Sequence, residues 1–157
     1  MRQTRKLNPE YIRHVNGLIN DSPYFKLLSM KVLDMGFGFS LLDIDLAGKH
    51  IQPFGFVHGG VFASLIDAAA FWAIFCEIEG QDAGATTVDL KLNYLAPAQS
   101  GKLIAKGRRI KLGKTLGYAE AMVSDEKGKL LAHGTSTLMV LPGNTLLADR
   151  PLPSKYL

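Results

Sequence analysis

Cysteine and unbroken apolar runs are both scarce in this sequence of 157 residues. The single cysteine, Cys76, excludes an internal disulfide, and its apolar neighbours favour a buried, unreactive thiol. The polar residues 1–6 are followed by no apolar core of a signal peptide. The longest apolar segment, Val57–Cys76, contains His58 and Asp67, which make membrane insertion costly. We therefore expect a cytoplasmic protein that does not insert into membranes.

Several familiar signatures of catalysis and binding are also missing. No two of the four histidines have the spacing of a metal site, so we expect neither a metal nor another bound cofactor. The sequence has no Gly-x-Ser-x-Gly elbow and no complete phosphate-binding loop, which argues against an α/β-hydrolase and a P-loop protein. The net charge of +4 is modest, and the basic run at residues 108–111 is better explained as a solvated strand edge than as a nucleic-acid site.

The length corresponds to one domain, and 47% apolar residues can fill a sizeable core. A helical segment is predicted over residues 1–29, because Asn8 can cap a helix that begins at Pro9 and runs to about Leu18. The main domain is predicted over residues 30–141. Residues 142–157 hold three of the seven prolines and are predicted to form an extended tail.

The main domain is predicted to contain six strands and one long helix. The expected elements are strands at Met30–Met35 and Phe39–Leu46, a helix from Gly59 to Ile78 that ends in a Gly80–Gly84 turn, and strands at Thr86–Leu95, Lys102–Leu112, Thr115–Ser124 and Leu130–Leu141. Short turn-rich links join the last four strands and predict an antiparallel meander. Between Val61 and Cys76 only Ser64 and Asp67 are polar, so the helix must be covered on nearly every side. A strongly curved sheet wrapped round it, an α+β layout, meets that need.

Asp67 is the most informative residue, because an unpaired carboxylate in apolar surroundings costs several kcal/mol and often marks a functional site. A structural role in hydrogen bonding to backbone or to a partner subunit is about equally expected. The same helix opens at Gly59-Gly60, where free N–H groups and the helix dipole can bind an oxyanion. Gly59 and Asp67 are about 12 Å apart along the helix axis, so one helix can hardly bring both to one carbonyl. If both act, the site should lie between two chains.

These residues resemble a known family. Val57-His58-Gly59-Gly60, Leu65-Ile66-Asp67-Ala68-Ala69 and Tyr94-Leu95-Ala96-Pro97-Ala98 are similar to motifs of the hotdog-fold thioesterases of the phenylacetate-degradation (PaaI-like) type. The resemblance implies a hotdog fold and a homodimer or dimer of dimers. It also implies hydrolysis of acyl-CoA or aryl-CoA thioesters without a metal, with coenzyme A entering only as part of the substrate.

The resemblance also assigns roles to individual residues. Asp67 is expected to act as nucleophile or general base, the Gly59 N–H to polarise the carbonyl, and Thr87 to help place the water or the carboxylate. Gln52 stands where many relatives have Asn, and its amide is expected to orient the carbonyl or the water. His58 is expected to hold the loop. The residues expected to contact substrate are His58, Gly60, Asn93 and, for the coenzyme A phosphates, Arg108, Arg109, Lys111 and Lys114.

Two other functions remain open at this stage. A hotdog dehydratase or hydratase would use His50 as base and Asp67 as acid. A non-catalytic acyl-CoA-binding protein would bind the same ligand without turnover. The aromatic residues near the helix offer surface for an aryl or medium-chain acyl group, although aromatics at helical spacing are more often part of a core. They are Phe54, Phe56, Phe71, Trp72 and Phe75.

Overall fold

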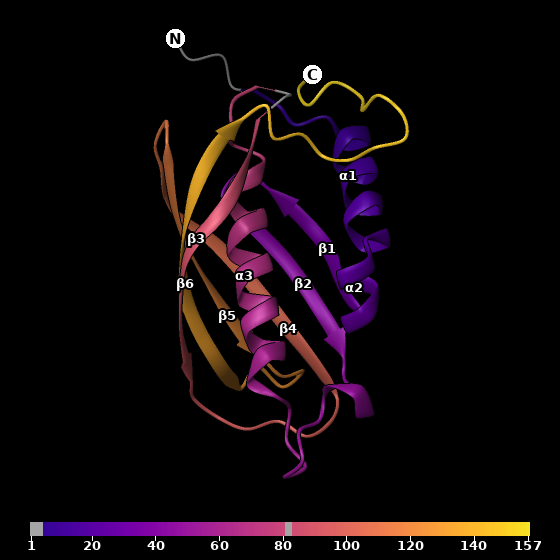
Figure 1. The fold of residues 1–157 in the computed structure, drawn as a ribbon, viewed down its shortest axis with the longest axis vertical. Coiled ribbons are helices and arrows are strands. Elements are labelled where there is room, and N and C mark those ends of the chain that lie inside the picture. The colour runs from indigo at the N-terminus through magenta and orange to yellow at the C-terminus, as the bar shows by residue number, and fades with distance from the viewer. Residues whose placement is uncertain (1–4, 81–82) are drawn as a thin grey trace.

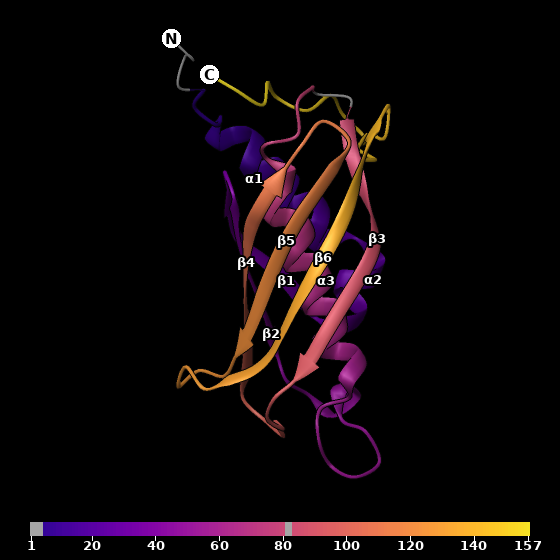
Figure 2. The same cartoon turned by 90° about the vertical axis from the view of Figure 1, so that its left-hand side faces the viewer.

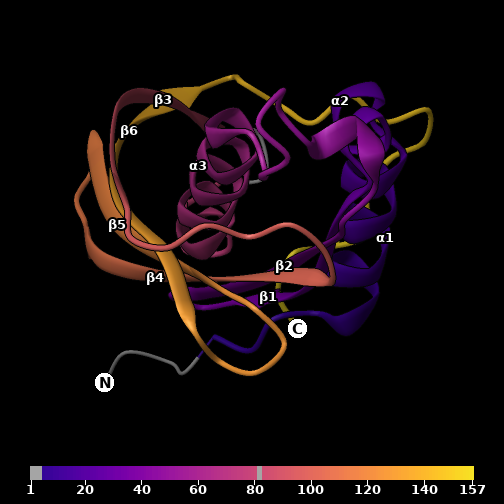
Figure 3. The same ribbon diagram turned by 90° about the horizontal axis from the view of Figure 1, so that it is seen from below.

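A long helix, α3 (Gly59–Phe75), lies along the concave side of a curved six-stranded antiparallel sheet (Figure 1). The view along the helix shows the sheet wrapping α3 on one side, with two shorter helices on the other side (Figure 3). The computed structural model describes residues 5–80 and 83–157. Residues 1–4 of the predicted N-terminal segment and residues 81–82 of the predicted Gly80–Gly84 turn lie outside that description. The α+β fold with a central wrapped helix is confirmed.

The helix α3 owes its burial to small residues on both sides of its contact with the sheet. Its carbonyl at Ala69 accepts a hydrogen bond of 2.6 Å from the buried hydroxyl of Ser40. A Cβ at Gly107 would lie 2.1 Å from the same carbonyl oxygen, so only glycine allows this close approach of strand and helix. The helix ends at Phe75, three residues earlier than predicted, and turns occupy the next residues.

The strands confirm the predicted positions to within three residues at each end. They are β1 (Met30–Gly36), β2 (Phe39–Asp45), β3 (Ala83–Tyr94), β4 (Lys102–Leu112), β5 (Leu116–Ser124) and β6 (Leu130–Pro142), and a short 3₁₀ turn, η1, covers Gly48–His50. On each strand of the β4–β6 hairpins, buried and exposed residues alternate, as expected for a sheet with one face on the core.

The predicted meander of the last four strands is wrong for β3. The order in the sheet is β1-β2-β4-β5-β6-β3, so only β4, β5 and β6 form a meander, and β3 pairs with β6 at the edge (Figure 2). The chain between β3 and β4 therefore crosses from one edge to the middle of the sheet. Its Ala98 carbonyl accepts a hydrogen bond from Val57 on the loop before α3, so this link passes the start of the helix instead of forming a hairpin.

Two helices precede the sheet and pack against β1. Helix α1 (Pro9–Asp21) begins at the predicted cap Asn8, whose side chain accepts from Glu10 N–H at 3.0 Å. It runs three residues beyond the predicted end and buries a stripe made by Tyr11, Val15 and Ile19. Helix α2 (Pro23–Leu28) follows at once, within the helical segment predicted over residues 1–29.

The C-terminal tail has little regular structure but is attached to the end of α3. Lys155 is 1% exposed, and its ammonium group donates to the carbonyls of Phe75 at 3.0 Å and Ile78 at 2.7 Å. One carbonyl is on the last residue of α3 and the other lies three residues after it, and a cation is favourable beside carbonyls at a helix C-terminus. Within the described residues, no helix has the length and apolar character needed to cross a membrane.

Candidate functional site

Asp67 lies at mid-length on α3, half-buried, on the side of the helix that faces β3. The hydroxyl of Thr87, on β3, donates to its carboxylate at 2.8 Å. Among the described residues no cation forms an ion pair with it. The carboxylate thus keeps free lone pairs in a largely apolar environment, which suits an attacking or proton-accepting group.

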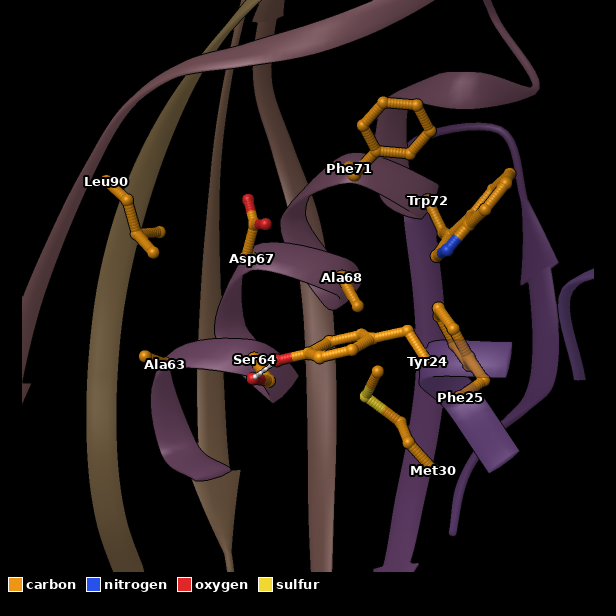
Figure 4. A pocket seen from close by; sticks show the side chains of 10 residues that line it. All are labelled: Tyr24, Phe25, Met30, Ala63, Ser64, Asp67, Ala68, Phe71, Trp72 and Leu90. Atoms are coloured by element: carbon orange, nitrogen blue, oxygen red, sulfur yellow. Dashed lines mark hydrogen bonds between the residues drawn. The ribbon is translucent and has the colours of Figure 1, made fainter. Parts of the chain in front are cut away.

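A pocket of about 370 Å³ opens beside this carboxylate, between α3 on one side and α2 and the start of β1 on the other (Figure 4). This volume falls within the range of roughly 300–1,000 Å³ found for small-molecule sites. The lining is mostly apolar, and its few polar side-chain groups are the Asp67 carboxylate, the hydroxyls of Tyr24 and Ser64, and the indole N–H of Trp72. The full lining is Tyr24, Phe25, Met30, Ala63, Ser64, Asp67, Ala68, Phe71, Trp72 and Leu90.

Of the aromatic residues named from the sequence, only Phe71 and Trp72 line this pocket. Phe75 is buried in the core, with 4% exposure. Phe54 and Phe56 lie on the loop before α3, and Phe54 is 86% exposed. The predicted aromatic surface therefore divides into a pocket wall, a core residue and an exposed loop.

Gly59 is the first residue of α3, and its N–H donates to no acceptor within the described residues. The preceding residue, His58, caps the helix: its Nδ1 accepts the Gly60 N–H at 2.8 Å. Gly60 is therefore engaged, and Gly59 keeps the free donor. The Tyr94 hydroxyl donates to the Gly59 carbonyl at 3.2 Å, and a Cβ at Gly59 would meet the Tyr94 ring at 3.2 Å. The N–H at Gly59 is thus held in place and accessible, as an oxyanion donor requires.

Gln52 lies in the loop that leads to His58, and its side chain is bound to that loop. Its amide oxygen accepts the Phe54 N–H, its own N–H donates to Phe56 O at 2.8 Å, and its carbonyl accepts from Gly55 at 2.9 Å. The side-chain amide nitrogen of Gln52 makes no hydrogen bond among the described residues, so it can donate to a ligand. The role predicted for Gln52, orienting a carbonyl or water, would therefore fall to that nitrogen.

The remaining predicted contacts with substrate are spread over the molecule. Asn93 is exposed near the end of β3, beside Tyr94. Arg108 Nε binds Glu120 at 2.9 Å and Arg109 Nε binds Glu77 at 2.7 Å, so both guanidinium groups already have carboxylate partners. The bond from Arg108, together with one from His133, holds the pKa of Glu120 below its ordinary value.

Lys111, near the end of β4, and Lys114, in the β4–β5 turn, are exposed, and the start of β5 after this turn packs against Ile74 near the C-terminal end of α3. Gly59 is at the opposite end of this helix, which is roughly 25 Å long. Within one chain the structure therefore brings Asp67 together with Thr87, and it places Gln52 in the loop that leads to His58, Gly59 and Gly60. It does not bring these two groups into contact, and it leaves the four basic residues distant from Gly59.

His50, considered from the sequence as the base of a dehydratase, is a structural residue. It is 1% exposed, its Nδ1 accepts the Ala47 N–H at 2.9 Å, and its Nε2 donates to the Leu28 carbonyl at 2.7 Å. Because Nδ1 accepts, the ring proton is on Nε2 and is also used. Neither nitrogen is free for a substrate, so the dehydratase reading based on His50 is wrong.

Two tyrosines near the site were missed in the sequence. In the sequence, Tyr94 is only the first residue of the segment Tyr94-Leu95-Ala96-Pro97-Ala98. Its position on β3, just before the link that crosses to β4, puts it against Gly59. Tyr24 was not considered, because nothing local shows that α2 faces α3. In the described part of the chain, no three histidine, cysteine or acidic side chains are grouped so that they could hold a metal ion.

Comparison with known proteins bears on these residues. Residues 54–132 match the family model of the thioesterase superfamily. Mouse acyl-coenzyme A thioesterase 13 is 30% identical over 99 residues, which are 62% of this chain and 69% of that protein. A 1,4-dihydroxy-2-naphthoyl-CoA hydrolase of Listeria monocytogenes is 29% identical over 113 residues, which are 72% and 91% of the two chains.

Among solved structures, a thioesterase of Haemophilus influenzae superposes with a TM-score of 0.76 at 24% identity and covers 89% of this chain and 94% of its own. This likeness confirms the hotdog fold predicted from the sequence. The roles assigned to single residues and the PaaI-like subtype stay predictions. The family match spans the loop before α3, the whole of α3 and the strands β3 to β5, which hold Gly59, Asp67 and Thr87, and it shows that the chain belongs to the thioesterase superfamily.

Proposed function

We propose that this protein hydrolyses acyl-CoA thioesters with an aryl or medium-chain acyl group. The observation that carries the proposal is the Asp67 carboxylate, which lines an apolar pocket, accepts a hydrogen bond from Thr87 and has no cationic partner among the described residues. The acyl-CoA substrates in the names of the mouse and Listeria relatives agree with this choice.

The reaction needs two groups at one carbonyl. The Asp67 carboxylate attacks the thioester carbon, or removes a proton from a water that attacks it, and a tetrahedral oxyanion forms. The Gly59 N–H donates to that oxyanion. The carbon–sulfur bond then breaks, and coenzyme A leaves as a thiolate that takes up a proton. If water made the attack, this step yields the free acid; if Asp67 made it, water hydrolyses the acyl–Asp67 anhydride to the free acid and regenerates the carboxylate. A thiolate is a good leaving group, so a strong general acid is not required.

The two groups come from different chains in this proposal. Gly59 and Asp67 are about 12 Å apart along one helix axis, which is too far for one carbonyl. The edge strand β3 supports a homodimer, because it is 12 residues long, lies at the edge of the sheet and exposes Val88 at 52%. A second copy paired along β3 would lay its α3 beside this one and bring its Gly59 toward Asp67.

The proposal is tested with purified protein and a panel of acyl-CoA thioesters, with free thiol measured by a colorimetric reagent. The wild type is expected to release thiol, and Asp67→Asn, which keeps the shape and removes the charge, should lower kcat by at least about a thousandfold. Thiol release unchanged in Asp67→Asn would refute the role of Asp67. Tight acyl-CoA binding without thiol release by the wild type would favour the non-catalytic binding protein instead.

A further inference from the structure

The pocket beside Asp67 has one wall from outside the segment that matches the family. Residues 54–132 supply α3 and Leu90, whereas Tyr24, Phe25 and Met30 come from α2 and the start of β1. Tyr24 is 54% exposed, and its hydroxyl reaches across to Ser64 on α3 at 2.6 Å (Figure 4). This hydroxyl is the one polar group that the α2 wall presents in the described lining.

Helix α2 is attached firmly enough to act as a fixed wall. The carbonyl of Leu28, at its end, accepts from buried His50, and Ser29 accepts from Lys49 at 2.7 Å. On the other side of α2, Asn20 at the end of α1 exchanges two hydrogen bonds, of 2.8 and 3.0 Å, with the backbone of Val32 on β1. The C-terminal end of α2 is therefore bound to η1, the preceding helix α1 is bound to β1, and the Tyr24 hydroxyl is bound to α3.

The direction of the hydrogen bonds decides whether the Tyr24 oxygen can donate to a ligand or only accept from it. The Ser64 hydroxyl donates its single proton to the Gly60 carbonyl at 2.8 Å, because a carbonyl can only accept. In the bond between Tyr24 and Ser64, the proton must then come from Tyr24. The phenol oxygen has no further proton to donate, and it faces the pocket as a hydrogen-bond acceptor only.

We infer that Tyr24 is a specificity-determining residue that selects acyl groups with a hydroxyl placed to donate to its phenol oxygen. This inference rests on the proposed function. Ser64 precedes Asp67 by three residues, about 4.5 Å along the helix and on the same face. When a thioester carbonyl is bound at Asp67, the Tyr24 hydroxyl lies about the width of one aromatic ring from it. A substituent on the far side of an aryl group can therefore reach the Tyr24 oxygen.

The test compares kcat/KM for three thioesters of coenzyme A: benzoyl, 4-hydroxybenzoyl and 4-methoxybenzoyl. The wild type should prefer the hydroxyl over the unsubstituted ring by about tenfold, the usual worth of one good hydrogen bond. It should disfavour the methoxy group, whose oxygen can only accept, because the Tyr24 oxygen has no proton left to donate to it. Tyr24→Phe should bring the ratio of kcat/KM for the 4-hydroxybenzoyl thioester to that for the benzoyl thioester to about one.

A second variant tests the direction of the bonds. Ser64→Ala removes the acceptor for the Tyr24 proton and frees that proton for the substrate, so the methoxy thioester should gain about tenfold relative to wild type. Tyr118→Phe is the matched control, because Tyr118 lies on the outer face of β5, 40% exposed, and should leave all ratios unchanged.

Three outcomes are distinguished. Equal rates for the three thioesters in the wild type, or a hydroxyl preference that survives Tyr24→Phe, would overturn the inference and leave the proposed function intact. A Ser64→Ala variant that gains nothing on the methoxy thioester would overturn the assigned direction of the bond. No thiol release from any thioester by the wild type would reject the proposed function and this inference with it.

Discussion

Thr87→Val tests whether the bond from Thr87 holds the Asp67 carboxylate for catalysis. Valine keeps the branched shape of threonine on β3 and removes only the hydroxyl that donates at 2.8 Å. A hydrogen bond to a charged group contributes about 1.5–3 kcal/mol, so its loss corresponds to a fall of roughly 10–150-fold in rate. Because the bond orients a reacting group and does not contact the substrate, the fall should appear in kcat more than in KM.

The assay is initial-rate thiol release, with the best thioester of the panel, over a range of substrate concentrations. Thr87→Ser keeps the hydroxyl and should stay within about threefold of wild type. Circular dichroism and a thermal melt establish that both variants are folded. A Thr87→Val enzyme with kcat within twofold of wild type would refute the reasoning, because Asp67 would then need no orienting donor.

Three further changes test the packing that supports the site. His50→Ala leaves the Ala47 N–H and the Leu28 carbonyl without their buried partner and should lower the free energy of unfolding by about 3 kcal/mol in urea titration. A loss below about 1 kcal/mol would contradict the structural role of His50. Gly107→Ala places a Cβ 2.1 Å from the Ala69 carbonyl oxygen and should cost at least about 2 kcal/mol in the same titration, whereas an unchanged midpoint would mean that helix and sheet separate easily. Burial raises the pKa of the Cys76 thiol from 9.0 to about 11. The buried neutral thiol therefore makes its full contribution to the free energy of unfolding below pH 9.0, and this contribution is lost as the pH rises toward 11. Over that range Cys76→Ala should lose less stability than wild type, by up to about 1.4 kcal/mol per pH unit, and parallel curves would exclude the effect.

The hydrophobic pattern predicted most elements of the fold. The apolar stretch after Gly59 had no polar face, and a helix of that kind requires a sheet curved round it, as found. The position of β3 was not predictable in the same way. Its exposed and buried residues and the link after Tyr94 are compatible with pairing to β4, and the choice of β6 depends on contacts between residues distant in sequence.

The candidate site was predictable where one residue conflicted with its surroundings. Asp67 in an apolar helix and the free N–H groups at Gly59 are such conflicts, and the structure leaves both without a charged or backbone partner among the described residues. Tyr24 shows no conflict in its local sequence. Its place opposite Ser64 follows from how α2 packs. The role of His50 likewise depends on packing, because its buried ring uses both nitrogens in structural hydrogen bonds and cannot act as a base.

The central claim is that one chain supplies the carboxylate and another the oxyanion donor. Asp67→Asn and Gly59→Val chains with different affinity tags are co-expressed, and heterodimers are isolated by two successive tag purifications. Each homodimeric variant should be inactive, because Asp67→Asn removes the carboxylate and the side chain that Gly59→Val introduces crowds Tyr94 beside the N–H. The heterodimer contains one site with Asp67 from one chain and Gly59 from the other, and it should show about half of the wild-type kcat per dimer. A heterodimer as inactive as its parents, or a protein from which no heterodimer can be isolated, would contradict the claim.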